Sequence, residues 1–452
     1  MSKKYEPMWS SIDTHSAPDW YHDAKLGIFI HWGLYSVPAW APIGEHYAEW
    51  YPYYMYDKGS SWYEYHREHY GEDVEYIDFA GEFTAENWDP DEWAEFFADV
   101  GAGYVVLTGE HHDGFALWDS HYTKYNAVEM GPERDLVGDL AASVRDRDMK
   151  FAASYHANLN YYQPGFEGRF GHPGFEGAGG DYRSEDAGPG PEYVDFMNAK
   201  HRELIRKYEP DLLWFDVPCA DSDRVHAREI IADYYNAAAE WDKTVAVNDR
   251  AATDARGSHA DFSTPEYETY DEISEDKWEA CRGLGFSFGY NAAETEEDHL
   301  TAEELIQSFV DIVSKNGNLL INVGPKADGT IPDLQKRPLT GLGTWLDTNG
   351  EAIYGTTYWA TSEDSISDVE VRYTWKDETL YAICLDWPTD DLVLGIEDHV
   401  DLETIDSVEL LDGDLDLDFD RDGDFSVALP EDPPTEAPAY AIRISDVSGI
   451  GR

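Results

Sequence analysis

The stretch DPDEWAEFFADVGAGYVVL (Asp89–Leu107) contains the repeating unit that decides the fold. Asp89 can cap a helix, Pro90 suits the first helical position and acidic residues fill the first turn, so we predict a helix over Pro90–Val100. After a short glycine-containing turn, Tyr104–Leu107 is an apolar run typical of a buried strand. A helix followed closely by a buried strand is the unit of a parallel α/β sheet.

The same alternation continues through the first three quarters of the chain. Eight strand-like runs occur, at Leu26–Ile30, Tyr104–Leu107, Phe151–Tyr155, Leu212–Phe215, Val245–Val247, Phe262–Glu266, Phe286–Tyr290 and Leu319–Val323. The clearest helical stretches between them are Pro90–Val100, Asp135–Asp146, Glu192–Tyr208, Asp223–Glu240 and Ala302–Ser314. Eight units of strand and helix predict a (β/α)8-like, TIM-type barrel. The Gly-, Pro- and His-rich segment Gly165–Gly190 is expected to be a long loop over one end.

The pattern changes near residue 356, where helical periodicity ends. Short alternating strands replace it, at Val369–Trp375, Leu380–Leu385, Leu392–Leu394, Val408–Leu411, Phe425–Leu429 and Tyr440–Ile444. Turns rich in Asp, Gly and Pro separate them, as in an antiparallel domain. We therefore predict a catalytic barrel over residues 1–355 and a small antiparallel β-sandwich over residues 356–452, which we expect to buttress the barrel.

The charge of the chain excludes two classes of partner. It has 93 acidic and 32 basic residues among 452, a formal net charge of −61. Such a surface repels phosphates and anionic lipids, so we expect neither nucleic acid nor membrane as a partner. No apolar run is long enough to span a bilayer. A hydrophobic content of 42% argues against disorder.

Charge and cysteine usage together indicate a compartment. The three cysteines, Cys219, Cys281 and Cys384, show no zinc-ligand spacing, and the N-terminus lacks the apolar segment of a secretory signal. We therefore expect a cytoplasmic protein with reduced thiols. A large acidic excess is tolerated when molar salt shortens the screening length to about 3 Å. The sequence thus predicts a halophilic cytoplasm.

Polar and aromatic side chains follow the strand-like runs. In order along the chain these are His31-Trp32, Glu110-His111-His112-Asp113, Tyr155-His156, Asp216, Asn248-Asp249-Arg250, Glu266, Tyr290-Asn291 and Asn322. Barrel active sites are built at the C-terminal ends of the strands. Carboxylates, imidazoles and tryptophans suit a pyranose, whose hydroxyls need hydrogen bonds and whose C–H faces stack on rings. A pair of carboxyl groups predicts glycoside hydrolysis.

Five segments resemble motifs of the α-L-fucosidases of glycoside hydrolase family 29. They are KLGIFIHWGLYSVPAW (Lys25–Trp40), EWYPYYMY (Glu49–Tyr56), HHDGFALWDS (His111–Ser120), LLWFD (Leu212–Asp216) and NGNLLINVGPKADGTIP (Asn316–Pro332). The resemblance covers most of the predicted barrel. It implies a (β/α)8-like barrel followed by a β-sandwich, which agrees with the reading from periodicity, and it implies hydrolysis of fucosides.

The resemblance also implies the two catalytic groups. The family nucleophile matches Asp216, which would attack the anomeric carbon and form a covalent glycosyl-enzyme. The family acid/base is harder to place. A segment similar to Phe262–Tyr267 carries it in part of the family, which nominates Glu266. Glu268 is the obvious rival, and Glu45 or Glu49 could approach from the first loop.

Residues that bind the sugar are implied in the same way. Matching positions in this sequence are His31, Glu49, Trp50, His111, His112, Tyr155 and Arg250. The competing reading is a zinc site made by His31, His111 and His112. We predict no metal, because adjacent residues such as His111 and His112 would point to opposite sides of a regular strand. His156 has no clear counterpart and is left as a supporting or loop residue.

This sequence departs from the family pattern at three places. Glu110 stands where a lysine is common, Val217-Pro218-Cys219 follows the nucleophile where a small residue is common, and Ser154-Tyr155-His156 replaces Tyr-Tyr-Ser. These departures concern the leaving-group preference more than the reaction. The loops Glu45–Glu75 and Gly165–Gly190 are expected to shape that part of the site.

The function predicted from the sequence is that of a retaining exo-α-L-fucosidase. Its partner would be a fucosylated oligosaccharide or glycoside, with no metal or organic cofactor. One alternative is the same fold acting on a related sugar such as a galactoside, and a polar rather than apolar lining around C6 would favour it. Another is a non-catalytic carbohydrate-binding protein on a barrel scaffold. The sequence leaves the oligomeric state open, a homo-oligomer included.

Overall fold

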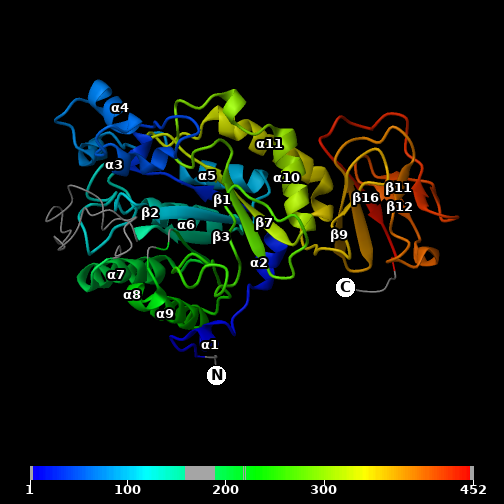
Figure 1. Ribbon diagram of the computed structural model, residues 1–452, viewed down its shortest axis with the longest axis horizontal. Coiled ribbons are helices and arrows are strands. Elements are labelled where there is room, and N and C mark those ends of the chain that lie inside the picture. The colour runs from blue at the N-terminus through cyan, green and yellow to red at the C-terminus, as the bar shows by residue number, and fades with distance from the viewer. Residues whose placement is uncertain (1–3, 158–188, 217, 219, 448–452) are drawn as a thin grey trace.

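The computed structural model describes residues 4–157, 189–216, 218 and 220–447 (Figure 1). Its first part is a curled, all-parallel sheet of seven strands in the order β5-β4-β3-β2-β1-β7-β6. The strands are β1 (Leu26–Ile30), β2 (Tyr104–Glu110), β3 (Lys150–Tyr155), β4 (Leu212–Phe215), β5 (Ala246–Val247), β6 (Trp278–Gly283) and β7 (Gly317–Val323). The predicted (β/α)8-like, TIM-type class is confirmed.

An extended segment takes the place of an eighth regular strand. Phe262–Glu266, predicted as the sixth strand, lies between β5 and β6 and makes isolated parallel bridges to both sides. The bridges pair Phe262 with Asn248, Ser263 with Trp278 and Glu266 with Cys281. The segment therefore closes the barrel and brings Glu266 into it.

The prediction of a strand over Phe286–Tyr290 is wrong. That segment is irregular, and the strand in this position is β6. Its sequence, WEACRG, carries Glu279, which interrupts the apolar pattern although its side chain is fully buried. The carboxylate accepts hydrogen bonds inside the barrel from Tyr21 (2.8 Å), Tyr104 (2.5 Å) and Trp214 (2.9 Å). A satisfied buried charge thus hid a strand from pattern analysis.

Helices cover the sheet on the outside. They are α1 (Trp9–Ile12), α2 (Asp19–Ala24), α3 (Tyr51–Tyr54), α4 (Ser61–His69), α5 (Pro90–Asp99), α6 (Leu136–Arg145), α7 (Pro191–Tyr208), α8 (Ser222–Val225), α9 (Ala227–Glu240), α10 (Ala302–Ser314) and α11 (Asp333–Asn349). The helix predicted over Asp223–Glu240 is divided into α8 and α9, because His226 adopts a left-handed φ of 56°. Asp89 caps α5 as expected. Among the described residues, no helix combines the length and the apolar character that a membrane span requires.

Of the two loops expected near the site, the structure describes only the first. Residues 45–75 are largely helical, since they contain a 3-10 helix (Ala48–Trp50) together with α3 and α4. The predicted loop Gly165–Gly190 lies almost entirely outside the described residues.

The C-terminal domain is antiparallel, as predicted. One sheet has the order β13-β12-β16-β10-β9-β8 and the other β11-β15-β14. Their strands are β8 (Glu363–Asp364), β9 (Val371–Lys376), β10 (Thr379–Cys384), β11 (Leu392–Leu394), β12 (Val408–Leu410), β13 (Leu415–Asp416), β14 (Phe419–Asp420), β15 (Phe425–Val427) and β16 (Tyr440–Ile444). Leu380 and Ile442 of the larger sheet share one apolar core with Leu392 and Phe425 of the smaller one.

The larger C-terminal sheet is covered on both faces. Alternate residues of β10, such as Tyr381 and Ile383, pack into the core of the barrel domain instead of the sandwich core. Arg372 on β9 also reaches Asp311 on α10, with Nε and Oδ1 2.6 Å apart. Figure 1 shows the two sheets at one end of the molecule, beside α10, with α3 and α4 at the opposite end.

Candidate active site

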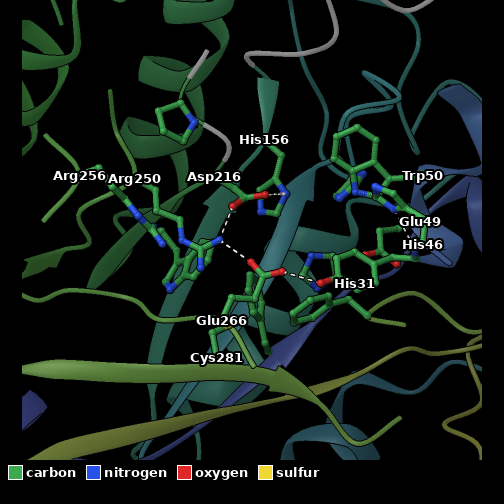
Figure 2. A pocket seen from close by; sticks show the side chains of 16 residues that line it. His31, His46, Glu49, Trp50, His156, Asp216, Arg250, Arg256, Glu266 and Cys281 are labelled. Carbon is green, nitrogen blue, oxygen red and sulfur yellow. Dashed lines mark hydrogen bonds and ion pairs between the residues drawn. The ribbon is translucent and has the colours of Figure 1, made fainter. Parts of the chain in front are cut away.

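A cavity of about 320 Å³ opens at the C-terminal ends of the barrel strands (Figure 2). All the residues predicted for the site line it except His112 and Tyr155. Among the described residues, those that line it are Phe29, His31, His46, Tyr47, Glu49, Trp50, His111, His156, Trp214, Asp216, Pro218, Arg250, Arg256, Glu266, Cys281 and Phe288. The strand ends therefore meet around one pocket large enough for a monosaccharide.

Strand parity explains which side chains reach the pocket. Successive side chains of a strand point to opposite faces, so every second residue faces the barrel interior. Phe29 and Trp214 belong to the interior core. His31 and Asp216 follow them two residues later, just beyond the ends of β1 and β4, and face the same side. The apolar interior of the barrel thus becomes the polar wall of the pocket.

Two carboxylates share one guanidinium at the centre of the site. Arg250 Nη1 donates to Asp216 Oδ1 at 2.7 Å and to Glu266 Oε2 at 2.8 Å. The two oxygens cannot be farther apart than these distances together, about 5.5 Å, which excludes the wider spacing of inverting glycosidases for this pair of oxygens. Thr264 holds the guanidinium in place, accepting from Nε through its hydroxyl and from Nη2 through its carbonyl, both at 2.9 Å.

Asp216 is held in its ionised form. Burial raises the pKa of this carboxyl, but the neighbouring His156 and Arg250 outweigh that effect and hold the pKa well below its usual range. Its side chain is only 12% exposed. An ionised, poorly solvated carboxylate is suited to nucleophilic attack.

Glu266 has a more open environment than Asp216. Its side chain is 30% exposed, and the Tyr47 hydroxyl donates to its Oε1 at 2.9 Å. The rivals considered for acid/base are placed differently. Glu268 and Glu45 are exposed and do not line the cavity. Glu49 does line it, and its carboxyl group accepts a hydrogen bond from the Gly289 N–H at 2.7 Å.

The buried imidazoles have defined protonation states. Asn322 Nδ2 donates to the Phe288 carbonyl, so its Oδ1 accepts the proton of His31 Nδ1 at 2.7 Å. Burial lowers the pKa of His31 to about 4, so the ring is neutral and its Nε2 is an acceptor. His112 Nδ1 donates in the same way to the His156 carbonyl at 2.9 Å. Its neutral Nε2, beside Asp216, is therefore an acceptor too.

His111 and His112 do not point apart as a regular strand would require. β2 ends at Glu110, so the pair lies beyond the strand, and the two ring centroids are only 4.3 Å apart. His111 reaches the cavity, whereas His112 packs between Trp50 and Asp216.

Glu49 and Trp50 come from the 3-10 helix at residues 48–50. Burial raises the pKa of Glu49 to about 8, more than the hydrogen bond from Gly289 lowers it. The side chain is thus a neutral carboxylic acid near pH 7 and can donate one hydrogen bond. The Trp50 ring is tilted against His112, with centroids 4.8 Å apart.

One part of the cavity wall is apolar. Phe29, Trp214, Cys281 and Phe288 line it, and each is at least nine-tenths buried. Cys281 is a free thiol, which burial keeps protonated by raising its pKa. This wall offers nothing that would bind a hydroxyl strongly.

Tyr155 is not brought to the pocket, and His156 takes its place. The Tyr155 ring stacks on His201, and its hydroxyl donates to the Met197 carbonyl at 3.0 Å. β3 places Ala152 in the barrel interior, so Ser154 and His156 share the inward parity and Tyr155 faces the helices. Counting parity along Phe151–Tyr155 would have selected His156.

The lining includes other residues that the sequence did not suggest. Trp214 and Cys281 lie on strands, at positions whose side chains face the barrel interior. Counting alternate residues along LLWFD would have identified Trp214. His46, Tyr47 and Arg256 come from irregular segments, where periodicity gives no signal.

The side chains that could bind a metal ion differ from the set His31, His111 and His112 considered from the sequence. Nitrogens of His31, His111 and His156 lie within 4.8 Å of one another, and a second group combines His112, His156 and Asp216. Three neutral imidazoles could hold zinc. The same nitrogens are equally suited to hydroxyl groups of a sugar.

The chain matches two family models in succession. Residues 1–351 match the model described as alpha-L-fucosidase, and residues 363–445 match the alpha-L-fucosidase C-terminal domain. Human tissue alpha-L-fucosidase is 33% identical over 458 residues, an alignment that covers 99% of this chain and 92% of the human protein. An alpha-L-fucosidase of Dictyostelium discoideum is 34% identical over 88% of this chain and 84% of its own length.

Solved structures show the same likeness in three dimensions. A crystal structure of Thermotoga maritima alpha-fucosidase with a mechanism based inhibitor is 38% identical and superimposes with a TM-score of 0.84. The complex of that enzyme with fucose gives a TM-score of 0.82. Both alignments cover 98% of this chain and 100% of the bacterial one.

Proposed function

Because the chain belongs to the α-L-fucosidase family, we propose that it removes terminal α-L-fucosyl residues from glycosides by a retaining, two-step mechanism. One observation carries this proposal: Arg250 joins Asp216 and Glu266 through a single nitrogen. Both carboxylates are thereby within reach of one anomeric centre. Relatives of known structure bind fucose and a mechanism based inhibitor.

In the first step Asp216 attacks the anomeric carbon. A bond forms between a carboxylate oxygen and C1 while the bond from C1 to the glycosidic oxygen breaks, and Glu266 gives its proton to that oxygen. The leaving group departs as an alcohol. The sugar remains as a covalent ester of Asp216, with its configuration at C1 inverted.

In the second step Glu266 acts as the base. It takes a proton from water, whose oxygen attacks C1 and displaces the Asp216 carboxylate. This second inversion restores the original configuration. Glu266 ends protonated and Asp216 ionised, so the site is ready for another turnover. Arg250 stabilises whichever carboxylate is charged at each stage.

The walls of the cavity favour a 6-deoxy sugar. His31 and Glu49 present one acceptor and one donor to ring hydroxyls, as argued above. Phe29 and Phe288 with Trp214 form an apolar surface that suits a methyl group. A galactoside would have to bury its C6 hydroxyl there without a strong partner, which costs binding energy. The apolar wall therefore favours a fucoside over a galactoside.

The adaptation to salt and the compartment belong to the same proposal. A net charge of −61 would be strongly self-repelling at low ionic strength. Cys281 and Cys384 are free and buried, which suits a reducing cytoplasm. We expect the midpoint of thermal unfolding to rise between 0.1 and 2 M KCl, and a midpoint independent of salt would contradict the halophilic assignment. Activity in the soluble fraction of gently lysed cells, protected from external protease before lysis, would test the location.

The reaction is tested with p-nitrophenyl α-L-fucoside in concentrated salt. We expect turnover by the wild type and a loss of about 10⁴-fold for Asp216→Ala. Azide should restore activity by replacing the carboxylate as nucleophile. Since azide then attacks C1 only once, the product should be the inverted β-L-fucosyl azide. A folded wild type that hydrolyses the galactoside instead, or binds fucose without turnover, would overturn the proposal in favour of the related sugar or of a binding protein.

A further inference from the structure

His156 is a buried titratable residue with no role in the mechanism described so far. It follows β3 directly, and its side chain is 1% exposed. Its Nδ1 lies 3.3 Å from Asp216 Oδ2. On the other side of the ring, Nε2 is hydrogen-bonded to the hydroxyl of Ser154, which is fully buried. The three side chains therefore form a line from the interior of the barrel to the carboxylate (Figure 2 shows its last contact).

The positions of the protons along this line follow from the donors and acceptors. A neutral imidazole has one N–H and one acceptor nitrogen. If Nε2 carried the proton, the lone pair of Nδ1 would face the Asp216 carboxylate, and the Ser154 hydroxyl would lose its acceptor. If Ser154 donates to Nε2, the ring proton is on Nδ1, the nitrogen that lies 3.3 Å from Oδ2. Only this second arrangement gives the buried serine hydroxyl an acceptor, whose loss is costly, and places a proton between the imidazole and the carboxylate.

We propose that Ser154 and His156 form a positioning relay, in which the serine fixes the tautomer of the imidazole so that its Nδ1–H holds Oδ2 of Asp216. The inference rests on the proposed function, since it concerns Asp216 as nucleophile. It assigns positioning roles to two residues, of which His156 contacts Asp216 and Ser154 acts only through the imidazole.

The relay complements Arg250. The guanidinium donates to Oδ1 of Asp216 at 2.7 Å, and the imidazole Nδ1 lies 3.3 Å from Oδ2, so in the relay each oxygen has its own donor. Donors on both oxygens fix the rotation of a carboxylate about its last side-chain bond. A donor on one oxygen alone leaves that rotation free. His112 Nε2 also lies 3.8 Å from Oδ2, but its proton is on Nδ1 and donates to a backbone carbonyl. It cannot replace His156 as donor while neutral.

The surroundings keep the His156 ring neutral. Burial lowers its pKa, and the Asp216 carboxylate acts in the opposite direction. The rings of His31 and His112 and the Arg250 guanidinium add to the lowering, and the pKa ends well below its usual value. The imidazole therefore stays a single-proton group through the working range, which the tautomer argument requires.

The line of serine, histidine and aspartate has the connectivity of an acyl-transfer triad, with different roles. In such triads the serine is exposed and attacks, and the aspartate is buried and orients the imidazole. Here Ser154 is fully buried, whereas Asp216 borders the cavity. The roles of serine and aspartate are therefore exchanged, because here the serine orients the imidazole and the aspartate reacts.

The test compares variants that keep or remove the Nδ1 donor. The amide of Asn can occupy the place of Nδ1, so His156→Asn retains a donor, whereas His156→Leu fills similar space without one. We expect kcat/KM for p-nitrophenyl α-L-fucoside to fall about 100-fold in His156→Leu and less than about tenfold in His156→Asn. Without the donor the Asp216 anion is less stable, so the acidic limb of the pH profile should move to higher pH in His156→Leu only.

A double-mutant cycle tests the serine. Ser154→Ala should lower kcat/KM about threefold to tenfold in the wild-type background. In the His156→Leu background it should have no further effect, because Ser154 acts only through the imidazole. Additive losses would overturn the relay and indicate a structural role for the serine.

Folding and function are separated by further measurements. Thermal unfolding of each variant shows whether it is folded, and the wild type shows whether the enzyme hydrolyses fucosides at all. An inactive wild type contradicts the proposed function. An active wild type with equal losses and unmoved acidic limbs in His156→Leu and His156→Asn contradicts the relay alone. If His156→Leu does not fold, the same comparison is made with His156→Asn and His156→Gln. We expect His156→Asn to be active. His156→Gln should be impaired, because its amide reaches the place of Nε2 instead of Nδ1.

Discussion

The buried half of the pocket and its rim are built on different principles. Asp216 in the buried half is 12% exposed, follows a regular strand and faces fixed donors. Glu266 at the rim is 30% exposed, lies in the bridge-only segment between β5 and β6 and is held by Tyr47. One carboxylate is locked for attack, and the other keeps access to solvent and to the leaving group.

The difference follows from what each group must do. A nucleophile performs best as an oriented, poorly solvated anion. An acid/base group must exchange its proton with the leaving group and then with water, so it cannot be enclosed. Under the proposed function the sugar would occupy the buried half, where the strand ends provide rigid positions. The leaving group would then face the rim, where His46, Tyr47 and Arg256 come from irregular segments.

Removing the guanidinium that joins the two halves should have the largest effect. We expect Arg250→Met to lower kcat/KM about 10³-fold, or about 4 kcal/mol, because both carboxylates lose a charged donor. Steady-state kinetics with p-nitrophenyl α-L-fucoside measures this. Arg282→Met is the control, since Arg282 does not line the cavity and its Nε donates to the Gly283 carbonyl. Equal losses in both variants would show that the link between the halves is unimportant.

The buried half should also affect how stability depends on pH. Burial raises the pKa of Glu49 to about 8, from an ordinary value of 4.5. Between these values the folded state holds a proton that the unfolded state releases, so stability falls as pH rises. Glu49→Gln removes this titration. Between pH 5 and 8 we expect the wild type to lose on the order of 3 kcal/mol relative to the variant. Unfolding by guanidinium chloride at both pH values measures the free energy of unfolding of the wild type and of Glu49→Gln. If that free energy changes equally with pH in the two proteins, Glu49 is ionised in the folded protein.

At the rim, Glu266 should show an effect that depends on the leaving group. We expect Glu266→Ala to lower kcat/KM about 10²-fold more, or about 2.7 kcal/mol more, for an alkyl fucoside than for dinitrophenyl fucoside, which needs no protonation. Azide should give the retained α-L-fucosyl azide, because it attacks the covalent intermediate formed by Asp216. Glu268→Ala is the control and should behave as the wild type. If Glu268→Ala shows the dependence on the leaving group and Glu266→Ala behaves as the wild type, Glu268 is the acid/base.

The buried half was largely predictable from sequence, and the rim was not. Asp216 and His31 end apolar strands, and strand ends define barrel sites. Tyr155, which was predicted for this half and lies outside it, differs from His156 by a single position of strand parity. Periodicity therefore gave the right strand, and a stricter use of alternation would have given the right side chain.

What the sequence hid has a physical reason in each case. β6 was missed because Glu279 interrupts its apolar pattern, and only the fold shows that Tyr21, Tyr104 and Trp214 satisfy the buried charge. The contacts of Tyr47 and Arg256 depend on loops distant in sequence, for which no periodic signal exists. Segments that pair through isolated bridges, such as Phe262–Glu266, have strand-like patterns without regular strands.

The smallest expected effect concerns the single neutral hydrogen bond that holds the rim carboxylate. Tyr47 donates to Glu266 Oε1 at 2.9 Å, and Tyr47→Phe removes only this donor. A neutral bond of this kind is worth about 1 kcal/mol, so we expect kcat/KM for an alkyl fucoside to fall about fivefold. Because Tyr47 contacts the rim carboxylate and not Asp216, the acidic limb of the pH profile set by Asp216 should stay in place. Tyr53→Phe, at a ring that does not line the cavity, is the control. Movement of the acidic limb instead would mean that the two halves of the pocket are not independent.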